Sequence, residues 1–276
     1  MASLAALLSS LLWGGGDFIG GTMSRRLPVA AVFGISQACA LIALVIAVVA
    51  TGAWSASLGY LPWAIASSIL GMIGILAFYR ALALGPMGIV APFVGLAVVI
   101  PVAFGLVQDE VPAGMQVLGI VIAVVGILLA SGPELSTPQS AKPLALAVLA
   151  LVCFGTVYIT MAEGAQYSTL MTTTGMRVVS VGVFAVVAIF ARSLGGVRKP
   201  DLPALALLGI LDAGANIAYG WATTQGMLTT VAVLGSIYPV VTALLAAIFL
   251  HERLKPVQYV GAAATVVAIV MISAGG

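Results

Sequence analysis

The sequence predicts an all-α integral membrane protein with ten transmembrane helices in two inverted five-helix repeats. Composition is the first observation behind this prediction: 62% of the 276 residues are hydrophobic and only 7% are charged. Soluble domains carry roughly 25% charged residues, so water cannot be the main solvent of this chain. The second observation is spacing, because apolar runs of about 20 residues, enough to cross a bilayer, recur between short breaks rich in Gly, Pro and charge.

These runs predict each span in turn. The first is expected to be a retained span and not a signal peptide, because residues 1–13 contain no basic segment. Two spans are expected around residues 84–88, where two glycines and a proline indicate a turn, because one helix there would run for about 47 residues. The expected spans are residues 4–22, 29–51, 61–83, 88–107, 113–131, 143–162, 170–192, 202–224, 228–250 and 256–274.

The third observation is an internal repeat. An offset of 141 residues aligns Gly14 with Gly155 and Ala77 with Ala218, and one inserted residue then aligns an E-x5-Q-x2-G pattern that begins at Glu110 in one half. In the other half this pattern comprises Glu252, Gln258 and Gly261. We therefore expect a first repeat at residues 1–132, a connecting loop at 133–142 and a second repeat at 143–276. Because each half holds five spans, an odd number, the second half enters the membrane from the opposite side.

The basic residues predict the orientation. Of ten Lys and Arg residues, all except Arg177 fall at breaks on one face of this arrangement. The positive-inside rule places that face in the cytoplasm. We expect a multi-pass protein of a bacterial inner membrane with both termini outside the cytoplasm.

Two acids within the spans are the first candidates for function, because a carboxylate in hydrocarbon normally faces a cavity or a partner. Asp212 lies near the middle of span 202–224 and shares a helix face with Asn216 and Tyr219. Loss of hydration disfavours its charged form, so Asp212 could exchange a proton near neutral pH or bind a substrate ammonium group. The alternative is an internal hydrogen bond that serves structure alone.

Asp17 is the second acid, about 20 Å of helix into the first span. Trp13 precedes it by one turn, and five nearby glycines would let another helix or a ligand approach closely. The alternative is an acid near the helix end that pairs with Arg25 or Arg80. Neither Asp17 nor Asp212 aligns with an acid in the other half, so both break the symmetry of the repeat.

Other residues have weaker signals. Tyr79 and Tyr158 could stack on a ligand or simply pack. Arg177 could pair with Glu163 or with a substrate carboxylate. The prolines of spans 88–107 and 228–250 could mark broken helices that free backbone groups for a binding site, or simple kinks; they are Pro92, Pro101 and Pro239.

The chain offers no pattern for a cofactor, a metal or catalysis. Cys39 and Cys153 lie within apolar runs and are expected to be free packing residues, and the single histidine, His251, cannot make a metal site alone. We expect no catalytic residue, no metal, no cofactor and no nucleic-acid partner.

A family resemblance rests on residues spread over the whole chain. They are Trp13-Gly14, the run AFYRAL at 77–82, Arg177, Tyr238-Pro239 and the run LHERL at 250–254. With the repeat, these residues make the chain resemble the EamA family of the drug/metabolite transporter superfamily. The resemblance implies a central cavity lined by spans 1, 3, 4, 6, 8 and 9, with spans 5 and 10 behind it.

The resemblance also implies a function. We expect a secondary transporter and not an enzyme, which exports a small metabolite, such as an amino acid, or a lipophilic cation by alternating access, with or without a coupled proton. Its partners would be the small-molecule substrate, the lipid bilayer and, where transport is coupled, protons. The site residues expected to contact substrate are Trp13, Asp17, Tyr79, Tyr158, Asp212, Asn216 and Tyr219.

Two alternatives stay open. One is a facilitator without ion coupling, in which Asp17 and Asp212 bind substrate or pack. The other is an intramembrane aspartyl protease, because residues 14–17 match a G-x-G-D pattern and two acids sharing a proton can catalyse hydrolysis. A four-residue match that includes three glycines is a weak signal in a glycine-rich chain. Such proteases also resemble one another in having a tyrosine directly before an aspartate, whereas here Leu211 stands before Asp212.

Overall fold

A computed structural model describes residues 1–84, 94–130, 141–191, 196–251 and 255–274, without the side chains of residues 79, 82, 83, 141 and 191. The described part is helical and contains no strand. Seven of its helical segments are long and apolar enough to cross a membrane. An all-helical membrane fold is thus confirmed, whereas the expected span 88–107 lies partly outside the described residues.

The first half of the chain begins with three long helices, α1 (Ala2–Ser24), α2 (Val29–Thr51) and α3 (Leu61–Leu84). Gly52 ends α2 in the left-handed conformation, with φ of 68°, which is the usual helix stop for a residue without Cβ. Two short 3₁₀ turns, Ala53–Ser55 and Leu58–Tyr60, lead into α3. After a 3₁₀ turn at Leu96–Val98 follow α5 (Val99–Val107) and α6 (Gly114–Ala130).

The second half begins with α7 (Ala141–Ala191), whose 51 residues would measure roughly 75 Å if straight. The helix is interrupted at Ser168, whose backbone is extended (φ −170°, ψ 112°). The Ser168 hydroxyl accepts a hydrogen bond from the backbone N–H of Met171 (3.2 Å), as an N-cap residue does at a helix start. Ser168 lies between the expected spans 143–162 and 170–192, so α7 consists of two helical segments.

The remaining helices are α8 (Leu202–Gln225), α9 (Leu228–Gly235), α10 (Tyr238–Phe249) and α11 (Pro256–Ala274). The expected span 228–250 is therefore broken between α9 and α10, directly before Pro239. Proline has no N–H to continue the helical hydrogen bonds, and it occupies the first turn of α10, where none is needed.

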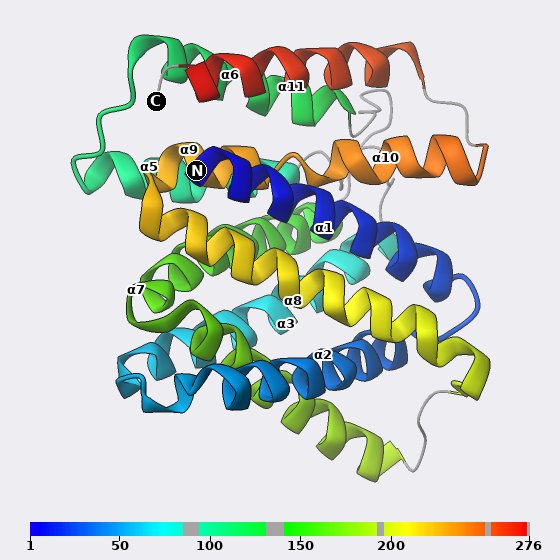
Figure 1. The fold of residues 1–276 in the computed structure, drawn as a ribbon. Helices are drawn as coiled ribbons and strands as arrows, with labels where there is room; N and C mark the ends of the chain where they lie inside the picture. The colour runs from blue at the N-terminus through cyan, green and yellow to red at the C-terminus, as the bar shows by residue number, and fades with distance from the viewer. Residues whose placement is uncertain (85–93, 131–140, 192–195, 252–254, 275–276) are drawn as a thin grey trace.

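The helices lie roughly along one direction (Figure 1), with α6 and α11 packed on each other at one edge of the bundle. At one end of the bundle, named the connection end, lie the ends of α1 and α10 and the starts of α2, α8 and α11, whereas the start of α1 and the end of α11 lie towards the other. At the connection end Arg26 forms an ion pair with Asp201 (2.9 Å), which joins the α1–α2 connection to the start of α8.

The packing repeats at the offset found in the sequence. A Cβ placed on Gly14 would lie 2.5 Å from Val241 Cβ and 2.9 Å from the carbonyl oxygen of Tyr238. A Cβ on Gly155 would lie 2.7 Å from Ile100 Cβ and 2.6 Å from the carbonyl oxygen of Ala97. Because Ala97 and Ile100 precede Tyr238 and Val241 by the same 141 residues that separate the glycines, the two contacts are equivalent.

The α6–α11 pair repeats in the same way. Gln116 Nε2 donates to the carbonyl of Ile272 (3.5 Å), and Gln258 Nε2 donates to the carbonyl of Ala130 (3.1 Å). Each glutamine also accepts from a backbone N–H three residues earlier, both at 2.8 Å. Gln116 and Ala130 precede Gln258 and Ile272 by 142 residues. The two hydrogen bonds are therefore equivalent: the glutamine of each half donates to the corresponding carbonyl of the other half.

Candidate functional site

Two adjoining cavities lie between the halves. The first, named the Ser67 cavity, has a volume of about 240 Å³ and extends past Ser67 and Ser68 of α3 and Met161 of α7. The second, named the Ser24 cavity, has a volume of about 280 Å³ and extends along α1 to Ser24. The cavities share five lining residues, Trp13, Asp17, Phe33, Ile75 and Asp212. Both acids predicted from the sequence thus lie where the cavities meet.

Asp212 is held by two donors. Its Oδ2 accepts a hydrogen bond from Gln37 Nε2 on α2 at 2.9 Å. The same oxygen lies 2.9 Å from Arg177 Nη2 on α7. Arg177 is buried, with its side chain only 6% exposed, whereas the Asp212 side chain is 26% exposed. Three helices therefore meet at one carboxylate oxygen, and the charge of Arg177 is balanced by Asp212 and not by Glu163.

Arg177 and Gln37 each retain one polar atom without a partner among the described residues. These atoms are Nε of Arg177 and Oε1 of Gln37, and both are fully buried. The hydroxyl of Ser180, one turn after Arg177, does not bond to either of these atoms. Its hydrogen is shared between the backbone carbonyls of Met176 and Arg177. The network around Asp212 is thus fixed in place but leaves unused hydrogen-bonding capacity.

Asp17 differs from Asp212 in having no partner. It lines both cavities and is exposed there, and within the described part of the chain no hydrogen bond or ion pair reaches its carboxylate. It therefore does not pair with Arg25 or Arg80 as the structural alternative supposed. Asp17 and Asp212 line the same two cavities, but no hydrogen bond between described residues joins their carboxylates.

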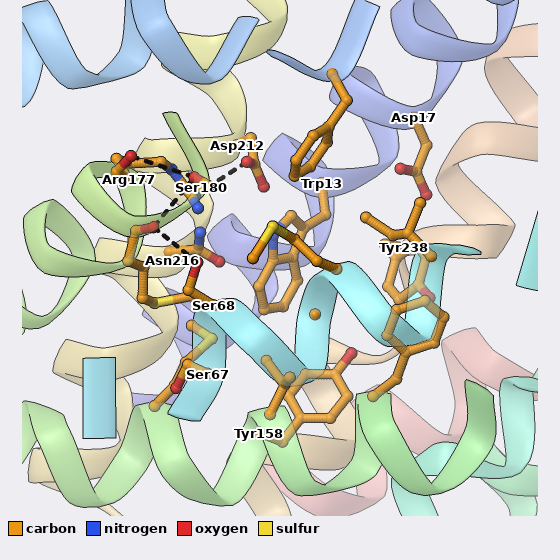
Figure 2. A pocket seen from close by; sticks show the side chains of 18 residues that line it. Trp13, Asp17, Ser67, Ser68, Tyr158, Arg177, Ser180, Asp212, Asn216 and Tyr238 are labelled. Carbon is orange, nitrogen blue, oxygen red and sulfur yellow. Dashed lines mark hydrogen bonds and ion pairs between the residues drawn. The ribbon is translucent and has the colours of Figure 1, made fainter. Parts of the chain in front are cut away.

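Aromatic side chains make the apolar wall. Trp13 contacts three tyrosine rings, with centroid distances of 5.8 Å to Tyr158, 5.6 Å to Tyr219 and 6.1 Å to Tyr238. Edge and tilted contacts of this kind are favourable because ring edges are positive and ring faces negative. Trp13, Tyr158 and Tyr238 line the Ser67 cavity, and Figure 2 shows Tyr238 near Asp17, with Arg177, Asn216 and Ser68 grouped elsewhere on the wall.

A family model described as the EamA-like transporter family matches residues 1–132 and, a second time, residues 141–274. The chain belongs to the EamA-like transporter family. The family matches once in each half of the chain, and the resemblance drawn from the sequence is confirmed.

Two further comparisons describe how far this EamA chain resembles known proteins. No curated protein matches it. A solved protein crystal structure matches it with a TM-score of 0.83 over 99% of this chain and 96% of the other, at 16% sequence identity. At that identity the likeness shows the shared fold alone.

Most site residues predicted from the EamA sequence lie together. Trp13, Asp17, Tyr158, Asp212 and Asn216 all line the Ser67 cavity. Tyr219 does not line it: its side chain is 0% exposed, and its hydroxyl donates to the backbone carbonyl of Tyr158 at 3.3 Å. Tyr219 therefore supports the Trp13 and Tyr158 rings from behind. The side chain of Tyr79 and the whole of Pro92 lie outside the described residues.

Gln37 is the functional candidate that the sequence interpretation missed. It is a polar side chain in the middle of α2, otherwise one of the most apolar helices, and it is 2% exposed. An amide within a membrane helix needs hydrogen-bond partners, so its position alone was a usable signal. Arg177 was noticed, but nothing local in the sequence relates it to Asp212, 35 residues away.

Proposed function

We propose that this protein is a secondary transporter that exports a small metabolite, such as an amino acid, or a lipophilic cation across a bacterial inner membrane by alternating access. Membership of a transporter family supports the broad class. The observation that carries the proposal further is that both cavities meet at Asp17 and Asp212, between two halves that pack reciprocally. Substrate bound there would lie on the boundary between the moving parts.

The proposal includes ten spans in two inverted five-helix repeats, with boundaries at residues 1–132, 133–142 and 143–276. The break at Ser168 supports counting α7 as two spans, and the reciprocal contacts of Gln116 and Gln258 support a two-fold relation between the halves. Five spans in each half would make that relation an inversion. The basic residues at the connection end, such as Arg26 and Lys199, support a cytoplasmic location for this end and both termini outside.

The size of the cavities supports a small substrate. Each is somewhat below the roughly 300–1,000 Å³ of pockets for drug-sized ligands. The pairing of Asp212 with Arg177 and Gln37 does not support an aspartyl protease, because a catalytic dyad requires two carboxylates that share one proton.

Uptake into proteoliposomes tests transport directly. Purified protein is first screened by thermal shift against amino acids, nucleosides, sugars and quaternary ammonium compounds, and stabilising compounds are then assayed for uptake with and without a pH gradient. Stimulation by the gradient indicates proton coupling, and uptake that ignores the gradient indicates a facilitator. Absence of uptake for every stabilising compound would contradict the transporter proposal.

Cysteine labelling tests alternating access. In a background with Cys39 and Cys153 replaced by Ala, Ser24→Cys reports on the Ser24 cavity and Gly71→Cys, where a Cβ meets no atom within 4 Å, on the Ser67 cavity; Gln225→Cys at the exposed end of α8 serves as control. A transported compound should change labelling by a membrane-impermeant reagent in opposite directions at the two cavity positions and leave the control unchanged. Parallel changes, or none, would argue against alternation.

A further inference from the structure

The charges within the cavities do not cancel. Asp17, Asp212 and Arg177 are the charged residues that line the two cavities in the described part of the chain. Arg177 is already engaged with Asp212 through Nη2 and Oδ2 at 2.9 Å. One carboxylate, that of Asp17, therefore remains without a compensating positive charge.

Asp17 also needs hydrogen-bond donors. A carboxylate has about four acceptor positions, and none of those on Asp17 is used by a described residue. Gln37, which lines the Ser24 cavity, has its amide directed to Asp212 through Nε2, and its Oε1 accepts no hydrogen bond. Nε of Arg177 is also unused but is buried, so the exposed Asp17 carboxylate still lacks donors, and a ligand that brings N–H groups would supply them.

The aromatic wall suits the same ligand. Trp13 lies one helical turn from Asp17, and Tyr158 and Tyr238 line the same cavity. The faces of such rings attract cations, with Trp the strongest, and the attraction grows when the cation is desolvated. The contacts of Trp13 with three tyrosines hold the ring in one orientation, so little ordering remains to be done on binding.

We propose that the substrates are small organic monocations, in particular primary amines with an apolar or aromatic body, whose ammonium group binds Asp17 beside Trp13. This inference rests on the proposed transport function and narrows it to one substrate class. In this proposal the Arg177–Asp212 ion pair keeps Asp212 from competing for the cation. Asp17 is the carboxylate that binds and releases the ammonium group.

A substrate carboxylate fits this site less well. Its only cationic partner among the cavity residues would be Arg177, whose charge is already balanced and whose side chain is 6% exposed. A carboxylate there would also approach Asp212 and Asp17, and like charges repel strongly where water is scarce. Acids and zwitterions should therefore bind more weakly than the matching amine.

Three probes that differ only in their charged groups test the inference: phenethylamine, phenylalanine and 3-phenylpropanoate. Binding to the purified full-length protein is measured by calorimetry at pH 8. We expect phenethylamine to bind at least tenfold more tightly than either other probe, and Asp17→Asn to weaken its binding at least tenfold. Glu163→Gln is the matched control, an acid within α7 that lines neither cavity, and it should leave affinity unchanged.

The possible outcomes separate the substrate class from transport itself. If phenylalanine or 3-phenylpropanoate binds as tightly as the amine, the inference is overturned, and uptake of that probe into proteoliposomes would leave the transporter proposal intact. If phenethylamine does not bind, or binds Asp17→Asn as well as the unaltered protein, the inference is also overturned. Thermal unfolding of Asp17→Asn checks that the variant is folded, and a reversed-charge probe that gains affinity on Asp17→Asn would support the charge argument independently.

Discussion

Arg177 and Asp212 neutralise each other inside the helix bundle, with Nη2 of one 2.9 Å from Oδ2 of the other. Removing one partner leaves an uncompensated charge in a region of low dielectric, which typically costs about 3–5 kcal/mol. We expect Arg177→Met to lower the stability of the detergent-solubilised protein by that order. Thermal or denaturant unfolding of the purified variant measures the effect.

A double variant separates the pair from its surroundings. Arg177→Met with Asp212→Leu removes both charges. The stability that this double variant loses should be clearly smaller than the sum of the losses in the two single variants. Some loss remains because Gln37 Nε2 no longer has its acceptor. Additive effects of the two single variants would show that the ion pair contributes no coupling energy.

The equivalent glycines of the two halves provide a second prediction. Gly14→Ala and Gly155→Ala each place a Cβ closer than 3.0 Å to backbone and side-chain atoms of the facing helix. Such overpacking typically costs about 1–3 kcal/mol, although Ala otherwise favours helix over Gly by up to about 1 kcal/mol. Both variants should therefore lower the unfolding temperature.

Gly21→Ala is the matched control, because a Cβ on Gly21 of the same helix α1 meets no atom within 4 Å. It should be neutral or slightly stabilising. If Gly14→Ala behaves like Gly21→Ala, the close approach of α1 to α10 is not rigid.

Much of the fold could be predicted from the sequence because the bilayer limits the possibilities. Runs of about 20 apolar residues specify helices such as α1, α2 and α11 almost without reference to the rest of the chain. The 141-residue offset also anticipated that Gly14 and Gly155 would occupy equivalent places. The length of α9 could not be predicted, because the end at Gly235 depends on how the following turn packs.

The site was only partly predictable. An acid in a hydrophobic helix is conspicuous, and both Asp17 and Asp212 lie in the cavities. Which acid has partners depends on helix rotation and on contacts between distant segments, such as that of Gln37 with Asp212, 175 residues apart. Tyr219 shows the same limit, because its helix face was correct while the neighbouring Trp13 and Tyr158 rings cover it.

Glu110 joins the two halves at the end where the termini lie. Its carboxylate accepts hydrogen bonds from the backbone N–H groups of Leu228 and, at 2.8 Å, of Thr229, which are the first residues of α9. An anion at a helix N-terminus satisfies donors that the helix itself leaves unused. We expect Glu110→Gln to lower stability by about 1–3 kcal/mol, since an amide offers one acceptor and no charge.

Asp109→Asn is a suitable control for this variant. Asp109 is adjacent, exposed and in the left-handed conformation (φ 62°), which Asn also tolerates well. It should unfold at nearly the temperature of the unaltered protein. Equal effects of the two variants would indicate that general loss of negative charge, and not the cap on α9, determines stability.

Topology offers a test that needs no purified protein. The basic residues at the connection end predict that both termini lie outside the cytoplasm. An alkaline phosphatase fused after Gly276 should therefore be active, because the enzyme folds only outside, and a fluorescent protein that matures only in the cytoplasm should stay dark there. Fluorescence from the second fusion would contradict the orientation or the count of ten spans.

The pH dependence of binding can show which acid exchanges its partner. A proton and an ammonium group compete for the same carboxylate, so the affinity for phenethylamine should fall as pH is lowered through the range in which that carboxylate takes up a proton. Asp17 has no described partner, whereas the charge of Asp212 is stabilised by Arg177 and Gln37. The other ionisable groups of the cavity wall are the phenols of Tyr158 and Tyr238 and the Arg177 guanidinium.

Three proteins compared from pH 5 to 8 should give distinct curves. The unaltered protein should lose affinity towards pH 5, Asp17→Asn should bind weakly at every pH, and Asp212→Asn should keep a pH dependence because Asp17 is still present. The hypothesis drawn from the sequence places the exchangeable proton on Asp212 and predicts instead that Asp212→Asn abolishes the dependence. Calorimetry in two buffers of different ionisation enthalpy counts the protons released per amine bound, and a count of zero at every pH would exclude competition at either acid.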